Sequence, residues 1–206
     1  MAYSKFTLDR LIEQFGIHTK LASGLFADRP SVPVRPWLTE TLDQNLPLLA
    51  ALGTEKARSE LAVMPVLLEV WHLFEKRVSL FSGVEFPVDR KTGLDGFCDF
   101  LLALGSEQLV ISAPVVALVE TKKADPGEGI AQCIAEMIGA QQFNEKRNEK
   151  IPVIYGASTS GVLWRFLRLT GKTVEIDLQD YHIDEPGRVV GILKSLIDEA
   201  RLTRGE

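Results

Sequence analysis

The sequence predicts an α/β protein in which a central mixed β-sheet is flanked by helices and preceded by an N-terminal helical extension. Short apolar segments with strand character gather between residues 84 and 119 and again between 151 and 178. A segment with helical periodicity, 125–150, separates the two groups, and this order is typical of a sheet covered by helices. The chain has 206 residues and 46% hydrophobic content, which is enough for one sizeable core, so we expect a single domain.

The N-terminal quarter should be helical with one irregular connection. Residues 5–15 have an amphipathic pattern, and 39–52 should form a second helix. Between them the stretch ADRPSVPVRPWL, residues 27–38, has prolines that exclude a regular element and predict a connector or a wrapping arm. The expected regions are N-terminal helices with this connector at 1–53, a core at 54–180 and a C-terminal helix at 186–203.

Residues 54–80 predict one long helix, or two helices joined at Pro65, because proline breaks or kinks a helix that contains it. Apolar residues recur through this segment at helical spacing. The stripe expected to face the core consists of Leu61, Met64, Leu68, Trp71 and Phe74.

From Val84 the pattern changes to that of strands. The stretch VEFPVDRKTGLDGFCDFLLALG predicts two strands around turn residues 89–93, and Pro114–Val119, apolar on both parities, predicts a central strand. Three more strands are expected at 151–159, 161–170 and 172–178, and the remaining helices at 125–150 and 185–202.

Composition limits the location and the partners of the chain. A formal net charge of −5 suits a soluble protein and argues against a surface basic enough to grip nucleic acid without help, although a local basic cleft is compatible with it. With neither a signal-peptide core nor a run of about 20 apolar residues, we expect a cytoplasmic protein with no membrane partner. Cys98 and Cys133 cannot form a disulfide framework or a four-ligand zinc site, and both should be small buried hydrophobes.

Charged residues stand where apolar strands should end. Glu120 and Lys122 follow the apolar run ALV and, two positions apart on a strand, share one face, with Thr121 on the other. Asp99 is a lone acid within GFCDFLLAL, where a carboxylate costs several kcal/mol unless it is paired or binds a metal. The charges could simply mark a strand end that reaches solvent, with Asp99 paired to Lys122.

Two acids and a lysine at the end of a central sheet also supply what phosphodiester hydrolysis needs. Carboxylate oxygens suit Mg²⁺, and an ammonium can orient or deprotonate a water and offset developing negative charge.

The segments GFCDF and VETKK together resemble the metal-binding core of the PD-(D/E)xK, or restriction-endonuclease-like, nuclease superfamily. The similarity runs from about Glu60 to Leu169, where IPVIYGASTSGVLWRFLRL resembles small stand-alone members and the nuclease domains of type I restriction enzymes. It implies a restriction-endonuclease-like core. It also implies that Asp99, Glu120 and the main-chain carbonyl of Thr121 hold Mg²⁺, with Mn²⁺ as a substitute, and that Lys122 positions the attacking water.

The resemblance implies two further site residues. Glu60 matches a helical glutamate that family members often carry near the metal, although it could instead be an acid complementing a helix N-terminus. Gln132 matches a glutamine that contacts metal-bound water or substrate, although it could face solvent. Asp95 shares strand parity with Asp99 and is the alternative first ligand, but the segment LDG favours a turn there.

The sequence thus favours a metal-dependent nuclease acting on nucleic acid, most simply DNA, with a homodimer as a possible assembly. The alternative is a non-catalytic protein that keeps the nuclease fold as a binding or assembly module. Seven basic residues flank the expected site in sequence and could meet phosphates: Lys123, Lys146, Arg147, Lys150, Arg165, Arg168 and Lys172.

Overall fold

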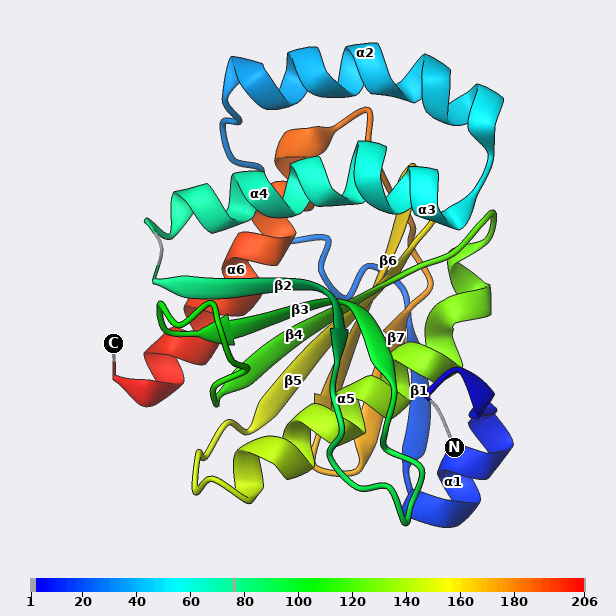
Figure 1. The fold of residues 1–206 in the computed structure, drawn as a ribbon, viewed down its shortest axis with the longest axis vertical. Coiled ribbons are helices and arrows are strands. Elements are labelled where there is room, and N and C mark those ends of the chain that lie inside the picture. Colours follow the sequence, from blue (N-terminus) through cyan, green and yellow to red (C-terminus); the bar gives the residue numbers. More distant parts are fainter. Residues whose placement is uncertain (1–2, 76, 206) are drawn as a thin grey trace.

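A mixed eight-stranded sheet organises the computed structural model, which describes residues 3–75 and 77–205 (Figure 1). From edge to edge the strands are β1 (His18–Ala22), β7 (Thr173–Asp177), β6 (Leu163–Thr170), β5 (Val153–Thr159), β4 (Val115–Thr121), β3 (Phe97–Leu104) and β2 (Val78–Glu85), and β8 (Tyr181–His182) pairs with β6. The pairs β1–β7 and β4–β5 are parallel, and the others are antiparallel.

Helices cover both faces of this sheet. In chain order they are η1 (Tyr3–Lys5), α1 (Leu8–Phe15), α2 (Pro36–Leu52), α3 (Glu55–Arg58), the π-helical turn η2 (Ser59–Val63), α4 (Met64–Leu73), η3 (Pro126–Gly129), α5 (Ile130–Glu145) and α6 (Pro186–Arg204). One apolar core lies between the sheet and the layer of α2, α4 and α6, and a second lies beneath α1 and α5 (Figure 1). The predicted α/β class, with a mixed sheet flanked by helices, is confirmed.

The central strand β4 and helix α5 form the unit that holds the charged residues. Every residue of β4 is buried, as its apolar pattern predicts. The chain crosses from β4 through α5 to the parallel strand β5, as parallel neighbours require. Asn144 fastens the far end of α5 to the start of β4, because its side chain accepts from the Val115 amide at 2.8 Å and donates to the Val115 carbonyl at 2.7 Å.

The predicted helix over 54–80 is wrong at its C-terminal end. Helix α4 ends at Leu73, residue 76 lies outside the described residues, and β2 begins at Val78 rather than near Val84. The segment is strand because it pairs with β3, and the fully buried Ser79 hydroxyl donates to the carbonyl of Gly105 at 2.9 Å. Tertiary pairing therefore overrides a local pattern that is equally compatible with a helix.

The predicted core-facing stripe is confirmed only in part. Phe74 is buried, and the half-buried Met64 and Leu61 pack against apolar clusters. Leu68 and Trp71 are half-buried. The residues that fill the core are their neighbours Val63, Val66, Leu67 and Val70. A π-helical turn directly before Pro65 adds a residue to the helical repeat, and α4 is apolar on most sides, so uniform 3.6-residue spacing identifies the buried face only in part.

Two features of the N-terminal region differ from expectation. Helix α2 begins at Pro36, inside the segment expected to be a connector, because proline is well placed in the first turn of a helix. The edge strand β1, with the polar sequence HTKLA, has no predicted counterpart. It is almost wholly exposed and is held by its ladder with β7, so it lacks the apolar alternation by which a strand is recognised.

Gly156 on β5 allows α5 to pack closely against the sheet. A methyl group at this position would lie 2.5 Å from Met137 Sδ and 2.6 Å from Cys133 Sγ. We therefore expect Gly156→Ala to reduce the free energy of unfolding by about 1–3 kcal/mol through overpacking. Urea unfolding of this variant, with Glu40→Ala on the exposed side of α2 as the control, checks this. Unchanged stability would mean that α5 does not lie this close.

Candidate active site

Asp99 lies where the pairing between β3 and β4 stops. The ladder runs as far as Phe100 opposite Val119, and at the next step the Thr121 amide donates 2.8 Å to Asp99 Oδ2 instead of to main chain. The side chain is half-buried, and it is not paired with Lys122. The alternative first ligand, Asp95, lies apart from this point and faces Arg90 at 3.5 Å.

Glu120 and Lys122 leave β4 on the same face and form an ion pair. Lys122 Nζ donates to Glu120 Oε1 at 2.6 Å, and the Glu120 side chain is only 2% exposed. The junction between η3 and α5 packs against this pair, since a Cβ at Gly129 would lie 2.3 Å from Ser158 Oγ and 3.0 Å from Lys122 Cγ. Only glycine lets the chain pass here without displacing the pair.

Gln132, on the first turn of α5, joins the pair as expected and is not a solvent-facing residue. Its Oε1 accepts from Lys122 Nζ at 3.2 Å, and its Nε2 donates to Glu136 Oε1 at 3.1 Å. Glu136 is fully buried, and its carboxyl lies against that of Glu120. Glu136 was not predicted as a site residue; the available signal was an acid one helical turn after Gln132.

Burial and like charge set the protonation of this cluster. Burial, with the Asp99 charge adding to it and Lys122 opposing it, raises the pKa of Glu120 to about 7. Burial, followed by the nearby Glu120 charge, holds the pKa of Glu136 well above its ordinary value. Burial also raises the pKa of Asp99, although the Thr121 amide opposes it. For Lys122 burial alone lowers the pKa, but the Glu120 carboxylate outweighs it and the net direction is upward.

A cleft of about 320 Å³ opens beside Asp99, between the N-terminal end of the α3–α4 helix and the edge strand β2. Glu60 lines this cleft together with Asp99, but its side chain is 60% exposed and pairs with Lys56 at 2.7 Å, so it lies on the solvent side of the cleft. Glu55, one turn earlier, lines the same cleft, and its charge raises the pKa of Asp99 further. Glu55 was not predicted as a site residue.

The flanking basic residues do not form one surface. Arg165 lies two strands from Glu120, through Ser158, but both of its terminal contacts go to Asp180 at 2.8 and 2.9 Å. Lys123 is exposed beside the site. The remaining five lie at the other ends of their elements, after the C-terminal half of α5 or near the β6–β7 turn: Lys146, Arg147, Lys150, Arg168 and Lys172. Phosphate contact near the cleft therefore depends on few cations.

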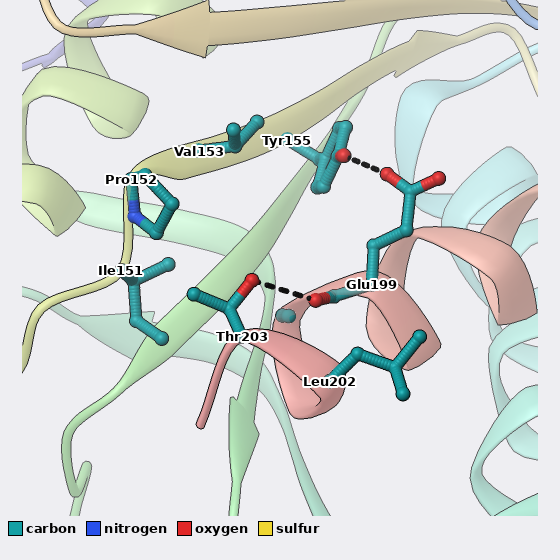
Figure 2. Close-up of a pocket in the computed structure, with 8 residues that line it drawn as sticks. Ile151, Pro152, Val153, Tyr155, Glu199, Leu202 and Thr203 are labelled. Carbon is teal, nitrogen blue, oxygen red and sulfur yellow. Dashed lines mark hydrogen bonds between the residues drawn. The ribbon is translucent and has the colours of Figure 1, made fainter. Parts of the chain in front are cut away.

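A separate pocket of about 280 Å³ lies between the start of β5 and the end of α6 (Figure 2). Ile151, Pro152 and Leu202 give it apolar walls, and the Tyr155 hydroxyl donates to the Glu199 carboxylate (Figure 2). The other Glu199 oxygen accepts from Arg29. These polar groups hydrogen-bond to one another, so this pocket has fewer polar groups available to bind a ligand or to catalyse a reaction than the Asp99 cleft has.

Asp99 and Thr121, which line the cleft, and Glu120, which is buried beside Asp99, have oxygen donors that suit a hard divalent cation. Among the described residues no three His, Cys, Asp or Glu side chains gather as a metal-binding group. However, Glu120 Oε2 is buried without a hydrogen-bond partner among the described residues, which leaves a carboxyl oxygen unsatisfied near Asp99. Mg²⁺ commonly needs only one or two carboxylates, because waters complete its coordination. Asp99, Glu120 and the carbonyl of Thr121 can supply such a set.

Comparisons with protein families, with curated proteins and with solved structures find no match to this chain. Within the part of the chain that the structure describes, no helix is long and apolar enough to cross a membrane. Both cysteines are buried and free, as expected.

The raised pKa of Glu120 predicts a pH dependence of stability. Folding moves this pKa from an ordinary 4.5 to about 7, so between these values the folded state binds more protons than the unfolded state. The free energy of unfolding should therefore fall, by about 3 kcal/mol through this group, as the pH rises from 4.5 to 7. We expect Glu120→Gln to flatten this fall.

Urea unfolding in the presence of EDTA, at pH steps across this window, measures the effect without interference from metal. The exposed control Glu40→Gln should keep the wild-type slope. A Glu120→Gln slope equal to that of the wild type would show that Glu120 is not held protonated by its surroundings.

Proposed function

We propose that the protein is a metal-dependent nuclease with a restriction-endonuclease-like core that hydrolyses phosphodiester bonds in nucleic acid, with DNA as the substrate. The observation that carries the proposal is the buried Lys122–Glu120 ion pair beside Asp99 at the ends of two adjacent strands. A strand that merely ended in solvent would leave these charges exposed, whereas Glu120 is 2% exposed. Buried charge in a cleft is expensive and is typical of functional sites.

Each residue of the cluster has a distinct role in the proposed reaction. Asp99, Glu120 and the Thr121 carbonyl would hold Mg²⁺ or Mn²⁺; the chemistry that the ion supplies when bound is neutralisation of phosphate charge and activation of water. Lys122 would orient the attacking water and offset the negative charge that develops as the water oxygen bonds to phosphorus and an ester oxygen leaves. Gln132 holds Lys122, and Glu60 and Glu55 border the path from solvent.

The net charge of the candidate site supports a requirement for a metal ion in substrate binding. The three acids around Lys122, namely Asp99, Glu120 and Glu136, leave the site without a net positive charge, even with Glu136 protonated. A phosphodiester would be repelled by such a site unless a divalent cation offset it. Metal binding is therefore the step on which binding of a polyanionic substrate depends in this proposal.

The test is a cleavage assay on single-stranded DNA, double-stranded DNA and RNA with Mg²⁺, Mn²⁺ or EDTA. We expect metal-dependent cutting that falls about 100-fold or more in Asp99→Ala and in Lys122→Ala, since each removes a charge that acts on the reacting groups. Glu40→Ala, an exposed acid on α2, is the matched control and should cut like the wild type.

Equal cutting by all four proteins would assign the activity to a contaminant and refute the site. Failure of the wild type to cut any substrate with either metal would contradict the nuclease and leave a non-catalytic module of the same fold.

A further inference from the structure

Glu136 is a buried acid that the proposed reaction does not yet use. It projects from the middle of α5, is fully buried, and lies among residues such as Cys133, Met137 and Ala140 that are equally buried and apolar. A carboxyl group in such surroundings costs several kcal/mol relative to an apolar side chain of similar size. Packing alone therefore gives no reason for an acid at this position.

The contacts of Glu136 form the end of a hydrogen-bond relay. Its Oε1 accepts from Gln132 Nε2 at 3.1 Å, Gln132 Oε1 accepts from Lys122 Nζ at 3.2 Å, and Lys122 Nζ donates to Glu120 Oε1 at 2.6 Å. Glu136 and Gln132 are four residues apart on α5, so they lie on the same side of the helix. The relay thus connects the fully buried Glu136 on α5 with Glu120 at the end of β4, through the half-buried side chains of Gln132 and Lys122.

A carboxamide has a donor end and an acceptor end, and only one orientation of Gln132 serves Lys122. With an acceptor at position 136, the NH₂ group points to it and the oxygen is left for the ammonium. The ammonium and the acceptor at position 136 therefore favour the same orientation of the amide. Without the acceptor, only the contact with Lys122 would hold the amide, and its NH₂ group would be left without a partner in the core.

We propose that Glu136 is a positioning residue for the hydrolysis: it fixes the amide of Gln132 so that the amide oxygen holds the Lys122 ammonium beside Glu120. This inference rests on the proposed function, and it adds a member that acts through Gln132 and does not touch the reacting atoms. What the role requires is an acceptor oxygen at position 136 and not a negative charge.

An acceptor at position 136 needs only an oxygen that faces Gln132. Glu136 Oε1 is that oxygen, since it accepts from Gln132 Nε2 at 3.1 Å. A glutamine at this position keeps an accepting oxygen, whereas leucine has none.

The experiment compares Glu136→Gln with Glu136→Leu, with Glu145→Gln at the exposed end of α5 as the matched control. For Glu136→Leu we expect a kcat about 10- to 100-fold lower with KM within about twofold of the wild type, as for residues that orient a ligand of the site. Glu136→Gln should keep kcat within about threefold. The Leu variant should unfold at the same or a higher urea concentration than the wild type, because a buried acid has been removed.

If Glu136 had only a structural role, loss of the accepting oxygen would not lower kcat selectively in Glu136→Leu. If Glu136→Leu is as active as the wild type, or if Glu136→Gln loses as much activity as Glu136→Leu, orientation of Gln132 through an acceptor is overturned. Should Glu136→Leu fail to fold, Glu136→Met, with an unbranched side chain of similar length, takes its place in the same comparison.

A second readout does not depend on activity. In ¹H–¹⁵N spectra, the Gln132 carboxamide, assigned by its loss in Gln132→Ala, should exchange slowly with solvent in the wild type and in Glu136→Gln. It should shift and exchange faster in Glu136→Leu. An unchanged Gln132 signal in Glu136→Leu would overturn the inference even if the wild type cuts DNA. If the wild type does not cut, the nuclease proposal fails, and the carboxamide signal still decides whether Glu136 orients Gln132.

Discussion

The ion pair between Lys122 and Glu120 is the contact on which the rest of the candidate site depends. Glu120 is almost completely buried, and its charge is compensated there by the ammonium at 2.6 Å. Without Lys122, two adjacent carboxyl groups, Glu120 and Glu136, would remain in an apolar core near a third acid, Asp99. An uncompensated buried charge costs several kcal/mol, so Lys122 is needed to keep these acids in the core.

The scaffold makes this arrangement possible by being rigid around it. The strand that carries the pair is buried along its whole length, and α5 is fixed at one end by Asn144 and pressed onto the sheet at Gly156. At the other end, Gly129 lets the chain pass within contact of both members of the pair. Close packing around the acids therefore carries a cost in stability, since every feature that buries them also raises the free energy of keeping them charged.

Much of this arrangement follows from sequence, because alternation along a strand is a strict rule. The apolar run that ends in Glu120 and Lys122 identified the central strand, and their two-residue spacing placed both side chains on one face. Gln132 was implied by the family resemblance alone, because local periodicity did not decide whether it faces the site or solvent. Glu136 was missed because an acid within a helix normally marks its solvent face, and α5 is buried on nearly all sides.

Other parts could not be predicted, because long-range packing decides them. The edge strand β1 is polar and is a strand only because β7 offers it a ladder. The inward face of α4 depends on the π-helical turn at Ser59–Val63, which local periodicity does not reveal. Glu60 lines the cleft beside Asp99 but is exposed and paired with Lys56, and the charge of Glu55, which was not predicted, acts on Asp99.

Direct titration with Mn²⁺ tests the central claim, that the buried acids hold a catalytic cation. Isothermal calorimetry of the wild type should detect Mn²⁺ binding, and Asp99→Asn and Glu120→Gln should each weaken it strongly, while Glu40→Gln should not. Binding that is absent from the wild type, or that is indifferent to both site variants, would contradict the account and leave Asp99, Glu120 and Lys122 as a structural charge cluster.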